Sequence, residues 1–139
     1  MHLRVLIDTG AVLALLDPRD RWHDACRAAL REIELPLLTT AAVLTETLHF
    51  LGHGRRMLRG WRFFRSDAVT LVNAAENDDL PELERLMLKY ADRPMDFADA
   101  TLVRLAEREG LSTILTVDRD FEVYRVGGRK AFRVLPRRS

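Results

Sequence analysis

Short apolar runs alternate with segments of helical periodicity along this chain. The apolar runs that predict buried strands are residues 3–7, 36–38, 69–72, 112–117 and 132–135. The segments that predict helices are residues 11–16, 22–33, 41–51, 55–65, 79–90, 95–109 and, as a short helix, 118–124. Strands that alternate with helices are typical of a parallel sheet covered on both faces, so we expect an α/β fold.

Length and composition favour one globular domain over residues 1–139. The chain has 139 residues, of which 47% are hydrophobic and 31% are charged, and it has no internal repeat or linker. The apolar run from Val5 to Leu16 contains Asp8, which suits neither a secretory signal nor a membrane span. The single Cys26 cannot form an internal disulfide. We therefore expect a cytoplasmic protein without a membrane association.

The net charge of +1 conceals an excess of arginine. Among the 22 basic residues only Lys89 and Lys130 are lysines, and there are 21 acidic residues. Arginine binds phosphate in a bidentate fork, which suits a nucleic-acid partner. Genomic base composition explains an arginine excess equally well, so composition permits such a partner without requiring it.

Two acids stand at the ends of predicted strands. Asp8 follows the first strand, and Asp118 follows the strand that ends at Val117. Both could simply be N-caps of the helices that follow, since aspartate is a good cap. In a parallel sheet, however, ligands bind at the carboxyl ends of the strands, where these two side chains would meet.

Three further acids lie on predicted helices. Glu46 shares an apolar stripe with Ala42, Val43 and Phe50, where a charge is costly unless it is paired or bound to a metal. A salt bridge, or the solvent-exposed boundary of the stripe, is the alternative. Asp96 and Asp99 project from one side of a helix start; capping explains Asp96 well and Asp99 less well.

Together, these acids predict a metal site. Clustered carboxylates repel one another unless a cation lies between them. Mg²⁺ or Mn²⁺ prefers oxygen ligands and can align a water molecule with a phosphodiester. The ordered set therefore indicates phosphodiester chemistry that depends on a divalent ion.

The ordered motifs resemble those of the PIN domain, and most of all the VapC toxins of bacterial toxin–antitoxin pairs. The matching segments are Leu6-Ile7-Asp8-Thr9-Gly10, Thr45-Glu46, Asp99-Ala100-Thr101-Leu102 and Thr116-Val117-Asp118-Arg119-Asp120-Phe121. The resemblance implies an α/β/α sandwich with a central, mainly parallel sheet. It also implies Mg²⁺-dependent endoribonuclease activity, a homodimer and a small VapB-type antitoxin that neutralises the enzyme.

The resemblance also assigns roles to residues. The four acids of the family site correspond to Asp8, Glu46, Asp99 and Asp118, of which Asp8, Asp99 and Asp118 are the expected metal ligands. The supporting residues would be Asp96, Asp120, Thr9 and Thr116. The RNA cleaved could be tRNA, rRNA or mRNA.

One predicted helix is rich in arginine. Arg55, Arg59 and Arg62 lie on one side of residues 55–65, and they could bind RNA phosphates or an acidic antitoxin tail. A solvated helix face is the alternative. Arg125, Arg129, Lys130 and Arg133 could serve in the same way.

Other functions fit the sequence less well. His49 and His53 have a spacing that can bind zinc, but Gly52 interrupts their helix. Cys26 is expected to be a packing residue, and Gly127-Gly128 a turn. A haloacid-dehalogenase-like phosphatase would need an aspartate at position 10, which is Gly10 here. A noncatalytic RNA- or protein-binding module would predict eroded acids, and they are intact.

Overall fold

The computed structural model describes residues 4–138 and contains a central sheet of five parallel strands. These strands are β1 (Leu6–Ile7), β2 (Leu37–Thr39), β3 (Val69–Leu71), β4 (Thr113–Leu115) and β7 (Arg133–Leu135). Their order is β3-β2-β1-β4-β7, and every neighbouring pair is parallel. The predicted parallel sheet is confirmed. The start of the first predicted strand, at Leu3, lies outside the described residues.

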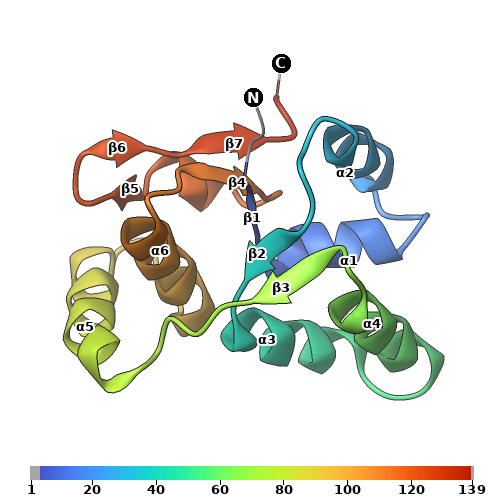
Figure 1. Cartoon of the computed structure of the whole chain (residues 1–139), viewed down its shortest axis with the longest axis horizontal. Helices are drawn as coiled ribbons and strands as arrows, with labels where there is room; N and C mark the ends of the chain where they lie inside the picture. Colours follow the sequence, from blue (N-terminus) through green and yellow to red (C-terminus); the bar gives the residue numbers. More distant parts are fainter. Residues whose placement is uncertain (1–3, 139) are drawn as a thin grey trace.

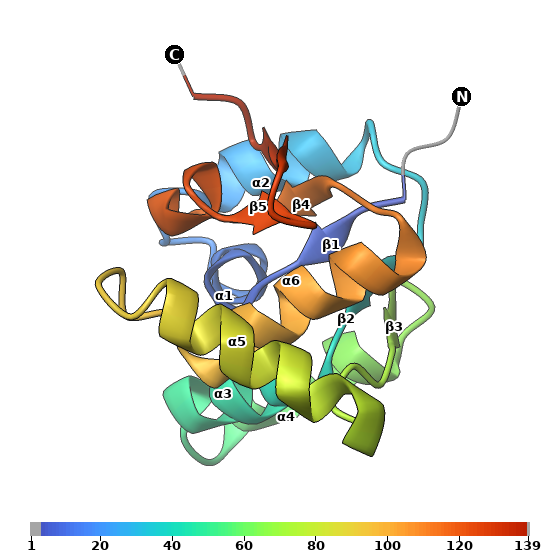
Figure 2. The same cartoon turned by 90° about the vertical axis from the view of Figure 1, so that its left-hand side faces the viewer.

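Helices cover both faces of this sheet. They are α1 (Thr9–Leu16), α2 (His23–Leu30), α3 (Ala41–Leu51), α4 (Arg55–Arg65), α5 (Leu80–Lys89) and α6 (Phe97–Glu109), with short 3-10 helices η1 (Asn77–Asp79) and η2 (Arg119–Glu122). In Figure 1, α5 and α6 lie to the left of the strands and α1 and α2 to the right. Figure 2 shows α6 lying along the sheet with α5 outside it. The α/β/α arrangement is as expected.

The strand order reverses direction at β1. From β1 the chain adds β2 and then β3 on one side, whereas β4 and β7 are added on the other side. The connections that follow β1 and β4 therefore leave the sheet in different directions. A crevice forms at the carboxyl ends of the strands at such a point. Asp8 and the segment 116–118 lie at this position.

The core explains why the strands read as continuous apolar runs. The side chains of Leu6, Ile7, Ile114 and Leu115 are completely buried, because helices cover both faces of these central strands. None of the helices among residues 4–138 is long and apolar enough to cross a membrane.

Several predicted boundaries were wrong by a few residues, and capping groups set two of them. α1 begins at Thr9 and α6 at Phe97, since Asp8 and Asp96 are their N-caps. The helix predicted over 22–33 ends at Leu30, ahead of Pro36. Thr113–Leu115 and Val69–Leu71 are shorter than the predicted strands.

The two short strands of a hairpin were not predicted, although its turn was. The short strands β5 (Arg125–Val126) and β6 (Lys130–Ala131) pair antiparallel around the predicted Gly127-Gly128 turn. Both glycines have positive φ, which confirms the turn. The strands were missed because each has only two residues, too few for an alternating pattern.

Candidate functional site

Asp8 is the most deeply buried acid of the predicted site. The residue is 5% exposed, and its side chain caps α1 by accepting a hydrogen bond from Ala11 N at 3.0 Å. Its other oxygen, Oδ2, accepts a short hydrogen bond from the Thr116 hydroxyl. Asp8 is therefore both an N-cap and a fixed carboxylate at the end of β1.

Asp118 is positioned by the same threonine. Its backbone N–H donates to Thr116 Oγ1 at 2.9 Å. Its carboxylate caps η2 by accepting from Asp120 N at 2.9 Å. Thr116 is completely buried beneath the two acids. One hydroxyl thus orients residues that follow two different strands.

Asp96 and Asp99 form a reciprocal capping box at the start of α6. Asp96 Oδ1 accepts from Asp99 N at 2.8 Å, and Asp99 Oδ2 accepts from Asp96 N at 3.4 Å. Asp99 Oδ2 also accepts a long hydrogen bond of 3.5 Å from Tyr124 Oη. Capping therefore uses one carboxylate oxygen of each residue, and the other oxygen of each remains available to a ligand.

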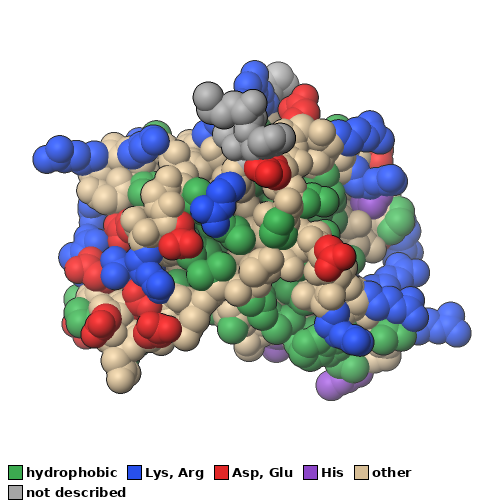
Figure 3. Space-filling model, in the orientation of Figure 1, with side chains coloured by type: hydrophobic (Ala, Val, Ile, Leu, Met, Phe, Trp, Pro, Cys, Tyr) green, Lys and Arg blue, Asp and Glu red, His purple; other side chains and the backbone are tan. Residues whose placement is uncertain are grey.

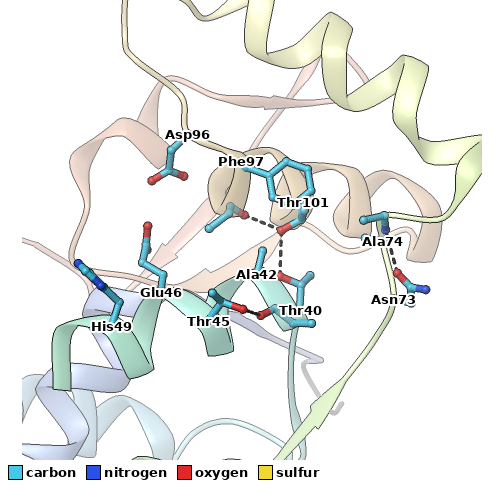
Figure 4. A pocket seen from close by; sticks show the side chains of 13 residues that line it. Thr40, Ala42, Thr45, Glu46, His49, Asn73, Ala74, Asp96, Phe97 and Thr101 are labelled. Carbon is cyan, nitrogen blue, oxygen red and sulfur yellow. Dashed lines mark hydrogen bonds between the residues drawn. The ribbon is translucent and has the colours of Figure 1, made fainter. Parts of the chain in front are cut away.

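Glu46 reaches the same region from α3. Its carboxylate faces that of Asp96 across the mouth of a pocket (Figure 4). Thr9 lies nearby at the start of α1, and its hydroxyl is close enough to lower the pKa of Glu46. That hydroxyl is fully buried yet makes no well-formed hydrogen bond within residues 4–138. A buried hydroxyl that is so weakly hydrogen-bonded, beside several acids, suits a site that takes a further polar ligand.

These groups surround one cavity of about 240 Å³. The acids and the threonine that line it are Asp8, Thr9, Glu46, Asp96, Asp99 and Asp118. Thr116 supports the cavity from beneath without lining it. Asp120 is not a lining residue; its carboxylate lies 3.7 Å from Arg93 Nη1. The fold thus brings together all four predicted catalytic acids.

The cavity holds carboxyl groups that resist ionisation. Burial raises the pKa of Asp8 to about 7, and repulsion from Asp118 and Glu46 adds to the rise, which the Thr116 hydrogen bond opposes. Burial, together with repulsion from Asp96 and Asp118, raises the pKa of Asp99 to about 8. Burial likewise raises the pKa values of Glu46 and Asp118. Such shifts are typical of functional sites.

Two residues near the acids, Tyr124 and Arg138, could not be predicted from the sequence. Tyr124 is completely buried. Burial is the main cause that raises the pKa of its phenol, and repulsion from the nearby acids adds to it, so the hydroxyl keeps its proton and can donate a hydrogen bond. The Arg138 guanidinium lies 5.0 Å from the Trp22 ring and counteracts the rise in the pKa of Asp118. No local motif marks either residue, because only the tertiary fold brings them to the site.

The acid cavity lies between a larger pocket and a groove. On one side, Glu46, Asp96 and Ala98 also line an apolar pocket of about 690 Å³. On the other side, Leu13 and Phe50 also line a groove of about 270 Å³. The arginines of that groove are Arg19, Arg56 and Arg59.

The arginine helix α4 borders this groove with part of its predicted face. Arg55, Arg59 and Arg62 are all exposed, and basic side chains gather over α4 in Figure 3. Arg59 lines the groove next to the acids, and Arg62 lines a shallower one with Leu16. Arg55 lines neither. Only part of this exposed arginine face therefore borders the groove next to the acids.

The remaining candidates lie apart from the acid cavity. His49 is exposed on α3 beside the apolar pocket, whereas His53 follows the end of that helix. Cys26 is buried in the core as a free thiol. Within residues 4–138, no three His, Cys, Asp or Glu side chains are already gathered closely enough to hold a metal ion. The carboxylates surround the cavity rather than converge on one point.

Comparisons with known proteins agree with this fold. The PIN domain family model matches residues 5–127. Ribonuclease VapC26 of Mycobacterium tuberculosis is 31% identical over 137 residues, which cover 95% of this chain and 100% of that protein.

Solved structures show the same fold at lower identity. VapC20 of Mycobacterium tuberculosis, a sarcin-ricin loop cleaving toxin, has a TM-score of 0.77 and 22% identity over 86% of this chain and 93% of that one. PAE2754 of Pyrobaculum aerophilum has a TM-score of 0.52 and 20% identity over 86% and 84%. The family match spans most of the sequence, and this chain therefore belongs to the PIN domain family and is of the VapC type.

Proposed function

We propose that this protein is a metal-dependent endoribonuclease that hydrolyses phosphodiester bonds of RNA. The observation that carries the proposal is the cavity in which Asp8, Glu46, Asp99 and Asp118 meet at the carboxyl ends of β1 and β4. The similarity of the whole chain to Ribonuclease VapC26 supports the same activity.

The donor set of the cavity fits Mg²⁺, with Mn²⁺ as a substitute. Asp8, Asp99 and Asp118 would hold the ion, because hard divalent cations prefer carboxylate oxygens and water. The Thr9 hydroxyl has no well-formed partner within residues 4–138 and could hydrogen-bond to a water molecule in the cavity. A bound ion would supply positive charge that neutralises the clustered acids and the phosphate, and would lower the pKa of a water molecule.

The residues of the chain have separate tasks in this reaction. Thr116 holds Asp8 and the Asp118 backbone, so the ligands are oriented before substrate binds. Glu46, less buried than Asp8, would accept the proton of the attacking water. The water oxygen then bonds to phosphorus, the bond to the leaving ribose oxygen breaks, and that oxygen takes up a proton from solvent.

The basic groove supports RNA as the substrate. Acids alone would repel a polyanion, so the backbone needs cations outside the cavity. Arg19, Arg56 and Arg59 provide them within a groove that shares Leu13 and Phe50 with the acid cavity. We assign phosphates flanking the scissile bond to this groove, with Arg62 and Arg55 further out on α4.

We also propose that the protein is the toxin of a VapBC-type pair. The named relatives VapC26 and VapC20 support this assignment. A small VapB-type antitoxin would then inhibit it, with acidic side chains of the antitoxin on the arginines of α4, and the active form would be a homodimer. A short reading frame directly upstream of the gene is the expected genetic context.

The decisive experiment uses purified protein without antitoxin. Total bacterial RNA is incubated with Mg²⁺ or with EDTA, and Asp8→Asn and Asp99→Asn variants are compared with wild type. We expect discrete cleavage products that require the ion and disappear in both variants. The matched control is Asp24→Asn, an exposed acid on α2, which should cleave like wild type. Intact RNA with folded, Mg²⁺-bound wild-type protein would refute the proposal.

A further inference from the structure

A second cavity adjoins the acid cavity and shares two of its acids. It is an apolar pocket of about 690 Å³ between α3, α6 and the segment 73–75 (Figure 4). Glu46 and Asp96 stand between the pocket and the acid cavity and line both. A group bound in this pocket would therefore lie directly beside the acid cavity.

Small side chains form the floor of this pocket. Ala42, Ala74 and Ala98 leave the space open, and its volume falls within the roughly 300–1,000 Å³ of small-ligand sites. Phe97 stands at the edge with 44% of its surface exposed, immediately after Asp96. An exposed aromatic ring over an apolar floor is a surface on which a planar group can stack.

One wall carries an unused donor. Asn73 Oδ1 accepts a hydrogen bond from Ala75 N at 3.0 Å, which fixes the amide, while Nδ2 has no partner within residues 4–138. Arg108 Nη1 holds the same segment, donating to Asn73 O at 2.7 Å and to Asp79 Oδ2 at 3.1 Å. These hydrogen bonds hold this wall of the pocket in place without a ligand, and they leave the Asn73 amide at its rim.

The electrostatics of the neighbouring site limit what the pocket can take. A phosphate would be repelled by Glu46 and Asp96, and no arginine or lysine lines the pocket among the described residues. A neutral, flat group with acceptors at its edge meets no such penalty. A nucleobase has these properties and is attached to the phosphodiester that the acid cavity would cleave.

We propose that this pocket binds an unpaired nucleobase adjacent to the scissile phosphate, stacked against Phe97 with an edge toward Asn73. The inference rests on the proposed ribonuclease function and deepens it. RNA-binding proteins read single-stranded segments by stacking splayed bases on aromatic rings. The acid cavity, the pocket and the arginine groove then form one path for a single strand.

The test uses short single-stranded oligoribonucleotides in which 2-aminopurine, a fluorescent base, occupies one position at a time. They bind to Asp8→Asn protein, so that cleavage does not interfere. We expect the emission of one position to fall on binding because its base stacks. In Asp8→Asn/Phe97→Ala protein this quenching should disappear and binding should weaken roughly 10- to 100-fold. Asp8→Asn/Phe97→Tyr, which keeps an aromatic ring, should retain both.

The alternative occupants give different results. Equal quenching with and without the Phe97 ring, or oligoribonucleotide binding without quenching at any position, would overturn the base pocket. A Phe97→Ala variant that alters only the sedimentation of the protein would assign the pocket to a second copy of the chain and also overturn it. Metal-dependent cleavage by wild type, measured in parallel, tests the ribonuclease function separately.

Discussion

The Thr116 hydroxyl donates a hydrogen bond to Asp8 Oδ2 and so joins two residues that are 108 positions apart in the chain. The oxygen of this hydroxyl, Thr116 Oγ1, also accepts a hydrogen bond from the backbone N–H of Asp118 at 2.9 Å. A single buried threonine thus sets the relative position of the acids that follow β1 and β4. Its hydrogen bond also opposes the rise in the pKa of Asp8.

Thr116→Val should impair activity more than stability. Valine has nearly the same shape, but it leaves Asp8 Oδ2 and the Asp118 N–H without this partner. We expect metal affinity and kcat to fall by roughly 10- to 100-fold, the usual cost of losing a group that orients a metal ligand. The measurement is RNA cleavage against Mg²⁺ concentration.

Thr116→Ser is the matched control, because it keeps the hydroxyl and loses only a methyl group. It should retain most of the activity. If Val and Ser variants were equally impaired, packing rather than the hydrogen bond would explain the effect.

The acids should make the metal-free protein less stable at neutral pH. Asp99 has a pKa of about 8 in the folded chain, against its ordinary value of 3.8. Between these values the native state holds a proton that the unfolded state has released, so the free energy of unfolding falls as pH rises. Asp99→Asn stays neutral and should be more stable than wild type in EDTA at about pH 8, by roughly 2 kcal/mol.

Denaturant unfolding at about pH 4 and about pH 8 measures this difference. The gain should shrink toward pH 4, close to the ordinary pKa of 3.8, because Asp99 then keeps its proton in the folded state and keeps part of it in the unfolded state as well. Asp24→Asn, on the exposed face of α2, should show no such dependence. A destabilised Asp99→Asn protein at both pH values would mean that the capping box outweighs the repulsion.

The sequence located the acids, but it could not decide between two interpretations of them. Asp8 and Asp118 were predicted either as caps or as site residues, and the structure shows that each caps a helix and lines the cavity. Strand ends can be predicted because the apolar runs stop there. A second use of the same carboxylate depends on which strands become neighbours, and that is a tertiary property.

The surroundings of the acids were less predictable. Phe97 and Asn73 lie 24 residues apart in the sequence, and no periodicity connects them with a pocket. Tyr124 reaches Asp99 only because the segment after η2, which leads into β5, packs against α6. The functions of Glu46 and of the α4 arginines remain predictions, although their positions near the cavity are now defined.

Binding of Mg²⁺ should depend on pH. At about pH 6, Asp8 and Asp99 are mostly protonated because their pKa values are about 7 and about 8. An ion must then displace protons, so affinity should increase by about tenfold or more between pH 6 and pH 8 and level off above that. Titration calorimetry in two buffers of different ionisation enthalpy measures both the affinity and the protons released.

The Asp99→Asn variant serves as the control for this measurement. It should bind Mg²⁺ more weakly and with a smaller dependence on pH, since one titrating ligand is absent. Affinity of the wild-type protein that does not change over this range would contradict the assignment of these two acids as ligands.

Gly10 keeps the first turn of α1 against the end of β4. A Cβ added at Gly10 would lie 2.8 Å from Val117 Cγ2, which is too close for any carbon pair. The φ angle of Gly10 is not positive, so the obstacle is this contact and not the backbone. Gly10→Ala should therefore push Asp8 away from Asp118 and reduce kcat/KM by at least about tenfold, while the better helix propensity of alanine offsets part of the strain.

Val117→Ala removes the atom that the new methyl group would meet, so it should restore activity to the Gly10→Ala protein. The four proteins of this cycle are compared by kcat/KM at saturating Mg²⁺, together with their free energies of unfolding. Purely additive losses in the double variant would show that Gly10 is needed for another reason. Recovery would show that the distance between the ends of β1 and β4 is itself a determinant of catalysis, because neither substitution alters an acid.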